Sequence, residues 1–121
     1  MYLKRVLLVD DVYYNRVLID SLLTDWGFEV VMASNGKEAL ELLNGGNLDL
    51  VILDIMMPVM DGFEFLAAKS AEKNNIPVIV LSARNDETSI NKAIELGALD
   101  YVPKPFNSED LREKIFIYLS K

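Results

Sequence analysis

Acidic, hydroxyl and amine side chains follow apolar runs at several places in this 121-residue chain. Asp10 and Asp11 follow the first apolar run directly, Asp54 follows the third, Ser82 follows the fourth, and Lys104 lies just beyond the fifth. Carboxylates brought together repel one another, and a divalent hard cation with a nearby lysine relieves that repulsion. Carboxylate oxygens with retained waters suit Mg²⁺ better than softer metals. The pattern therefore predicts a carboxylate site for Mg²⁺.

Each of these residues also has an ordinary structural explanation when it is taken alone. An Asp after a strand often caps a helix or forms a turn, so Asp10, Asp11 or Asp54 could each do only that. A single Ser82 could be a capping or core hydroxyl, and a single Lys104 could be a solvated side chain. The convergence of all five residues at one predicted crevice is what favours a functional site.

Composition excludes several kinds of chemistry. The sequence contains no Cys and no His, which removes disulfides, thiolate nucleophiles, Cys-type zinc sites, Ser–His triads and phosphohistidine. Nineteen acidic against 12 basic residues give a net charge of −7, so we expect no direct binding to nucleic acid. The sequence shows no membrane-spanning apolar run and no signal-peptide pattern, so we expect a cytoplasmic protein without membrane contacts.

Five short apolar runs rich in Val, Ile and Leu predict β-strands. The first, third and fourth are continuous rather than alternating, which is typical of parallel sheets covered on both faces. The runs are Leu3–Val9, Phe28–Ala33, Leu48–Leu53, Ile76–Leu81 and Ala98–Val102.

Helical spacing of apolar residues after each run predicts five helices. Asn35 is expected to cap the second helix, and Asn107 or Ser108 the fifth, while Gly27 and Gly97 provide C-terminal stops for the first and fourth helices. The predicted buried stripes are Leu18, Leu22, Leu23 and Trp26; Ala39, Leu40 and Leu43; Phe63, Leu66, Ala67 and Ser70; Ile90, Ala93 and Ile94; and Leu111, Ile115, Tyr118 and Leu119.

Strands alternating with helices predict an α/β fold with right-handed crossovers and a doubly wound five-stranded parallel sheet. We expect the flavodoxin-like strand order 2-1-3-4-5, in a single domain over residues 1–121. Ligands bind such sheets at the carboxyl ends of the strands, at the switch point between strands 1 and 3. That order brings Asp10 and Asp11 beside Asp54.

The whole chain resembles the response-regulator receiver domains of two-component signalling, in particular chemotaxis-type regulators. Each matching motif is weak alone, but together, in this order and spacing, they are highly specific. The motifs are Val9-Asp10-Asp11, the segment from Asp54 to Gly62, Leu81-Ser82-Ala83, the segment from Gly97 to Tyr101, and Lys104-Pro105-Phe106.

The resemblance implies a phospho-acceptor signalling domain that works in a phosphorelay rather than an enzyme with a separate substrate. Asp54 would accept a phosphoryl group from a phosphohistidine on a sensor histidine kinase or histidine phosphotransfer protein. Asp10, Asp11 and Asp54 would hold Mg²⁺ together with the main-chain carbonyl of Met56. The domain would catalyse its own phosphorylation and autodephosphorylation.

The resemblance also implies a switch. Lys104 would contact the phosphoryl oxygens, and Ser82 would donate its hydroxyl to one of them. As Ser82 moves inward, Tyr101 would rotate and change the surface formed by the fourth helix, fifth strand and fifth helix, which signals to an output domain or protein. A cis peptide bond is implied before Pro105.

Three alternatives remain at this point. An FMN-binding flavodoxin would want a Ser/Thr/Gly-rich loop after the first strand, but residues 10–15 are acidic and lack Gly. A phosphatase of the haloacid-dehalogenase type needs Asp-x-Asp after that strand, whereas Asp10 and Asp11 are adjacent. A receiver used only as a binding surface would keep the fold without phosphorylation. The cognate kinase, pathway, oligomeric state and phosphoryl lifetime stay open, as does whether the chain is stand-alone.

Overall fold

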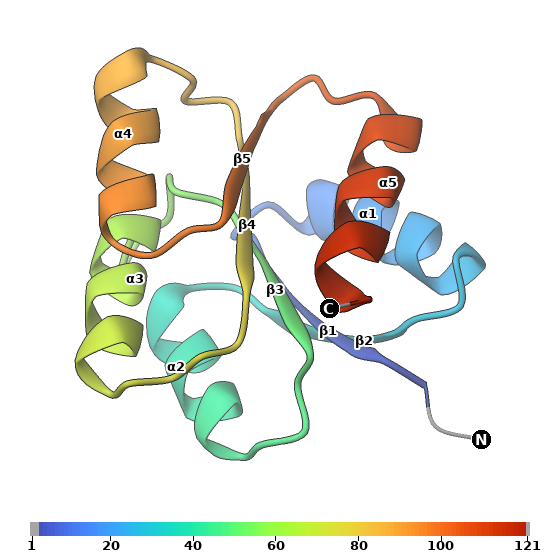
Figure 1. Ribbon diagram of the computed structural model, residues 1–121, viewed down its shortest axis with the longest axis horizontal. Helices are drawn as coiled ribbons and strands as arrows, with labels where there is room; N and C mark the ends of the chain where they lie inside the picture. The colour runs from blue at the N-terminus through green and yellow to red at the C-terminus, as the bar shows by residue number, and fades with distance from the viewer. Residues whose placement is uncertain (1–2, 121) are drawn as a thin grey trace.

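The computed structural model describes residues 3–120, and strands alternate with helices throughout this part of the chain (Figure 1). In chain order the elements are β1 (Arg5–Val9), α1 (Tyr13–Asp25), β2 (Glu29–Ala33), α2 (Gly36–Asn44), β3 (Leu50–Leu53), α3 (Gly62–Ala71), β4 (Val78–Ser82), α4 (Glu87–Glu95), β5 (Asp100–Pro103) and α5 (Ser108–Leu119).

The strands form one parallel sheet in the order β2-β1-β3-β4-β5, which confirms the predicted flavodoxin-like topology. In the register between β1 and β3, Val9 pairs with Leu53. The residues that follow, Asp10 and Asp54, therefore leave the sheet side by side.

Helices cover both faces of the sheet, with α2, α3 and α4 on one face and α1 and α5 on the other (Figure 1). Each face has its own apolar core. Alternate strand residues point to opposite faces, so both sides of β1, β3 and β4 are buried. This is why these three strands read as continuous apolar runs.

The predicted strands begin two residues before the observed ones in four of the five cases and one residue early in the other. Phe28, Leu48 and Ala98 are buried, although each precedes its strand. These side chains enter the core from the connecting segments, and only the residues after them join the ladder. The apolar runs therefore predict correctly that these side chains are buried, but not the residue at which the hydrogen bonds of the sheet begin.

Side-chain caps begin the second and fifth helices as predicted. The Asn35 side chain accepts a hydrogen bond from the Glu38 N–H at 2.9 Å. Asn107 caps α5, rather than the alternative Ser108, and accepts from the Glu109 and Asp110 amides.

The predicted buried stripe of α1 is partly wrong. Ile19 and Leu23 face the core, whereas the Leu18 side chain is 48% exposed. The face of α1 toward the sheet is centred one residue further along the helix than the stripe Leu18–Leu22 implies. Leu18 instead lies beside the loop that carries Lys104.

Lys69 occupies the buried face of α3, where the sequence pattern predicted Ser70. Lys69 is only 7% exposed, and its Nζ donates a hydrogen bond to the Asn74 carbonyl at 2.9 Å. Burial lowers the pKa of Lys69 below its ordinary value of 10.5 because the charged form is poorly solvated there.

We expect Lys69→Met to change the alkaline pH dependence of stability. The pKa of Lys69 is lower in the folded protein than in the unfolded chain, so at pH values between the two the unfolded chain binds more protons. Below that pH range, the charged Lys69 lowers the free energy of unfolding. Relative to Lys69→Met, the wild-type free energy of unfolding should rise as pH increases toward 10.5. Denaturant titrations at pH 7 to 10.5 measure this difference, and parallel pH profiles would contradict it.

Candidate functional site

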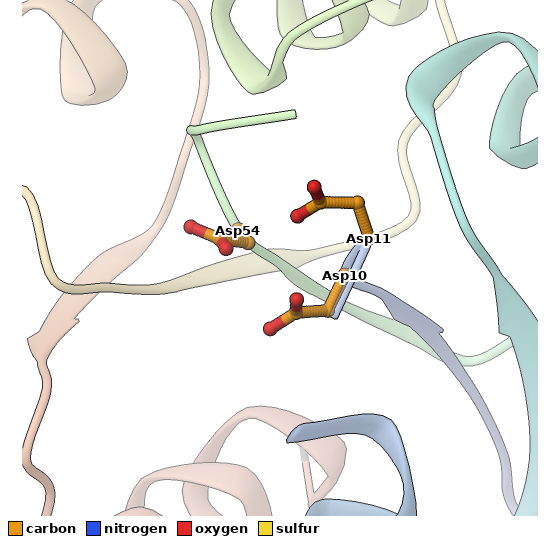
Figure 2. A group of neighbouring side chains, drawn as sticks. All are labelled: Asp10, Asp11 and Asp54. Atoms are coloured by element: carbon orange, nitrogen blue, oxygen red, sulfur yellow. The ribbon is translucent and has the colours of Figure 1, made fainter. Parts of the chain in front are cut away.

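Three carboxylates meet at the carboxyl ends of β1 and β3. Figure 2 shows Asp10 and Asp11 from the end of β1 and Asp54 from the end of β3, with their carboxyl groups around one space. Carboxylate oxygens of the three residues lie within 4.8 Å of one another. The backbone fixes this arrangement, since the Asp54 N–H donates to the Val9 carbonyl at 2.9 Å.

Asp10 is the most buried of the three, with 1% of the residue exposed. Its Oδ1 accepts a hydrogen bond from the Val12 N–H at 2.9 Å, so it does form a turn before α1. Its Oδ2 accepts from Lys104 Nζ at 2.8 Å and from Asn15 Nδ2 at 3.5 Å. Asp10 therefore forms a turn and also lies in the acidic cluster.

Asp54 is buried, and one side of its carboxylate faces positive charge. Its Oδ1 accepts from the Met56 N–H at 3.3 Å, and its Oδ2 lies 3.8 Å from Lys104 Nζ. Burial raises the pKa of Asp54 above its ordinary value, and the Asp10 carboxylate adds to the rise. Lys104, Ser82 and the Met56 amide oppose it without cancelling it. The ionised carboxylate is thus held in an unfavourable environment.

Lys104 reaches both buried carboxylates from the loop after β5. Its main-chain N–H donates to the Ser82 carbonyl at 2.9 Å, which anchors the loop to the end of β4. Pro103 precedes it, and the Lys104–Pro105 peptide bond is cis, as the resemblance implied. Two prolines flanking one lysine restrict the backbone that positions the amine.

The charge of the cluster tests whether a cation fits. Three carboxylates and one ammonium leave two negative charges, and among the described residues Asp11, the most exposed of the three acids, forms no salt bridge. The donors are all oxygen atoms, which suits a hard divalent ion. The cluster could therefore hold such a metal.

Ser82 and Tyr101 lie on the β4–β5 side of the same site. Ser82 is fully buried at the end of β4, and its Oγ accepts from the Arg84 N–H at 3.2 Å. The Tyr101 hydroxyl donates to the Arg84 carbonyl, so the ring reaches across the β4–α4 loop. Both predicted switch residues thus converge on the main chain of Arg84.

Sequence reasoning gave Arg16 and Asp61 no role in the site. Arg16 Nη1 donates to the Asp10 carbonyl at 2.6 Å, which ties the first turn of α1 to the end of β1. Asp61 caps α3 and lines a cavity of about 380 Å³ with Asp11, Met56 and Arg84. A helix beginning two residues after Asp11 would have placed Arg16 over the strand end, but nothing in the sequence pattern pointed to Asp61.

The family is established by comparison with known proteins. Residues 6–116 match the response regulator receiver domain, and the chain belongs to this family. It is 35% identical over 116 residues to sporulation initiation phosphotransferase F of Bacillus subtilis, which covers 96% of this chain and 94% of that protein. It is 42% identical over 113 residues to the transcriptional regulatory protein CpxR of Escherichia coli, covering 93% of this chain but 48% of CpxR. The chain therefore spans about half the length of that transcriptional regulator.

Solved structures show the same fold. The receiver domain of the Francisella response regulator 1452 matches with a TM-score of 0.91 at 32% identity and covers 97% of both chains. The Vibrio cholerae chemotaxis protein CheY4 matches with a TM-score of 0.88 at 32% identity, over 98% of this chain and 100% of that one. The chain is thus a receiver domain of the two-component response regulators, a signalling domain, and the flavodoxin and phosphatase alternatives are excluded.

Within residues 3–120, no helix combines the length and the apolar character that crossing a membrane requires.

Proposed function

We propose that this receiver, as a single domain over residues 1–121, accepts a phosphoryl group on Asp54 from a phosphohistidine of a sensor histidine kinase or histidine phosphotransfer protein. The observation that carries the proposal is the buried Asp54 carboxylate, held 3.8 Å from Lys104 Nζ in a cluster of three acids. A carboxylate nucleophile and a cation for the transferring oxygens are the two groups that phosphoryl transfer needs.

In the transfer step, an Asp54 carboxylate oxygen forms a bond to phosphorus while the phosphorus–nitrogen bond of the phosphohistidine breaks. The bonding electrons remain on the imidazole nitrogen of the donor. Lys104 neutralises charge on the phosphoryl oxygens, and the Ser82 hydroxyl donates to one of them. The protein contributes positioning and electrostatic stabilisation rather than acid–base chemistry. In autodephosphorylation, water attacks the same phosphorus, the bond between phosphorus and the Asp54 oxygen breaks, and inorganic phosphate leaves the free carboxylate behind.

Asp10, Asp11, Asp54 and the main-chain carbonyl of Met56 would hold Mg²⁺. When bound, the ion neutralises the acids and the charge on the transferring oxygens. The two uncompensated negative charges of the cluster support this assignment. Asp10 then has a second task, because its hydrogen bond from Lys104 keeps the amine at the site before the phosphoryl group arrives.

The output surface of this proposal consists of α4, β5 and α5. Phosphorylation would draw the Ser82 hydroxyl toward Asp54 and away from the Arg84 N–H, from which Oγ now accepts a hydrogen bond. The Tyr101 hydroxyl donates a hydrogen bond to the Arg84 carbonyl, so a shift of Arg84 would release this hydroxyl and let the Tyr101 ring rotate. A downstream domain or protein would read the changed surface.

A protein donor is supported by the exposed apolar face at the start of α1. Val12, Tyr13, Tyr14, Val17 and Leu18 are all at least 45% exposed, an unusual concentration for a free surface. Leu18 also lines a cavity of about 290 Å³ with Lys104 and Phe106, next to the acidic site. A donor packed on this face would bring its phosphohistidine to Asp54.

We expect Tyr14→Ala combined with Leu18→Ala to slow transfer from a protein donor by about tenfold or more, because aromatic and aliphatic anchors dominate such interfaces. Phosphorylation by acetyl phosphate, which needs no docking surface, should stay within about twofold of wild type. The matched control is Ile94→Ala combined with Leu99→Ala, which removes exposed apolar side chains elsewhere. Equal losses with both donors would contradict a docking role for α1.

Peptide mapping tests the proposed function directly. The wild-type chain is incubated with acetyl phosphate and Mg²⁺, the acyl phosphate is trapped by borohydride reduction, and the peptides are sequenced by mass spectrometry. Modification of Asp54 is expected. A modification at another residue would contradict the proposal, and none under any condition would favour a receiver that serves only as a binding surface.

A further inference from the structure

The loop between β3 and α3 contains a backbone turn that its sequence does not favour. The Met60 N–H donates to the Pro58 carbonyl at 2.7 Å, which closes a three-residue turn around Val59. Val59 has φ +69°, the left-handed region that L residues with a branched Cβ strongly avoid. Its side chain is 77% exposed, so burial of the side chain does not compensate for the strain. Something else must hold the turn.

The turn around Val59 is held by contact between Met60 and Gly36, the first residue of α2. The Gly36 N–H donates to the Met60 carbonyl at 3.1 Å. Gly36 is buried, and a Cβ at this position would lie 2.8 Å from Met60 Cγ and 2.9 Å from the Met60 carbonyl oxygen. The absence of a side chain at residue 36 is therefore what allows Met60 to approach α2. Asn35, the cap of α2, fixes the helix end that makes this contact.

The other end of the loop is equally constrained. The Gly62 N–H donates to the Ile55 carbonyl at 2.9 Å, and a Cβ on Gly62 would lie 2.7 Å from the Asp54 carbonyl oxygen. The segment 55–58 is thus held between Gly62 and the Val59 turn. It includes Met56, which lines the same cavity as Asp11.

We propose that Gly36 is a positioning residue for the metal-binding loop: its contact with Met60 holds the strained Val59 turn so that Met56 faces the acidic cluster. The inference rests on the proposed function, since it concerns the affinity of the same site for Mg²⁺. Displacing Met60 moves the loop, and the strained turn cannot absorb the displacement because Val59 has no neighbouring conformation of low energy. A glycine at residue 59 can absorb it.

The test is the Mg²⁺ dissociation constant of the full chain, measured by titration calorimetry without any phosphoryl donor. Gly36→Ala should weaken Mg²⁺ binding by about tenfold, as loss of outer-shell partners does at other metal sites. Val59→Gly should bind within about twofold of wild type and should restore the Gly36→Ala variant to a similar level. The matched control is Gly45→Ala at the other end of α2, where an added Cβ would have its nearest contact at an ordinary 3.4 Å.

Wild-type affinity in Gly36→Ala, or no restoration by Val59→Gly, would overturn the inference and leave the proposed function standing. A wild-type chain that binds no Mg²⁺ would overturn both. Should Gly36→Ala not fold, Asn35→Ala takes its place, because it removes the cap that fixes the end of α2 against Met60 and introduces no clash. Wild-type affinity in Asn35→Ala would then overturn the inference, and weakened binding would support it.

Discussion

Asp54→Asn is expected to lose phosphorylation by acetyl phosphate, by at least about 100-fold, while its fold becomes more stable in Mg²⁺-free buffer. The loss follows because an amide oxygen is a poor nucleophile. The gain follows from the raised pKa of Asp54, which shows that its charged form is less favourable in the folded protein than in the unfolded chain. An uncharged residue of the same shape removes that penalty at neutral pH.

Two measurements separate these effects. Rates of phosphorylation measure the chemistry, and denaturant titrations with and without Mg²⁺ measure the fold. Added Mg²⁺ should stabilise the wild type more than the variant and so reverse their order. The control is Asp61→Asn, in the cavity that Asp11 and Met56 also line, where the new side chain retains the oxygen that accepts from the Glu64 N–H. Retained phosphorylation in Asp54→Asn, or loss in Asp61→Asn alone, would show that the nucleophile has been misplaced.

Lys104→Ala is expected to separate phosphorylation from the surface change. Removing a cation from the transferring oxygens should slow phosphorylation by about 10- to 100-fold, but Asp54 remains able to accept the group. Without Nζ, which now lies 2.8 Å from Asp10 and 3.8 Å from Asp54, nothing draws the β5–α5 loop toward a phosphoryl group. The phosphorylated variant should therefore keep the unphosphorylated conformation of α4, β5 and α5.

Hydrogen–deuterium exchange over residues 87–119 measures this conformation, with intact mass recording the phosphorylated fraction of each sample. In the wild type, exchange should change on phosphorylation; in Lys104→Ala, it should not. Lys37→Ala, on the exposed side of α2, is the matched control and should behave as wild type. A normal change of exchange in phosphorylated Lys104→Ala would refute the assigned role of the lysine.

The sequence predicted those parts of the site that depend on strand order alone. Asp10, Asp11 and Asp54 each follow a continuous apolar run, and parallel pairing of the first and third runs places them together. Lys104 and Ser82 were predicted for the same reason, because β4 and β5 end at the same edge. The roles that these residues would have came from the family resemblance, not from geometry.

Features that depend on side-chain packing were not predictable. Leu18 belongs to an apolar stripe at helical spacing, yet the sheet contacts the neighbouring face of α1. The charge of Lys69 predicts a surface position, but the residue is buried and its amine donates a hydrogen bond to the Asn74 carbonyl. The turn at Val59 runs against local preference and depends on Gly36, which is 23 residues away in sequence.

The central claim is that Asp54 accepts a phosphoryl group in a Mg²⁺-dependent reaction. Its most direct test is the intact mass of the chain after incubation with acetyl phosphate, with Mg²⁺ or with a chelator, for the wild type and Asp54→Asn. We predict that the wild type gains the mass of one phosphoryl group only with Mg²⁺, and that Asp54→Asn gains none. An unchanged mass for the wild type in Mg²⁺, or an equal gain in the variant, would contradict the claim.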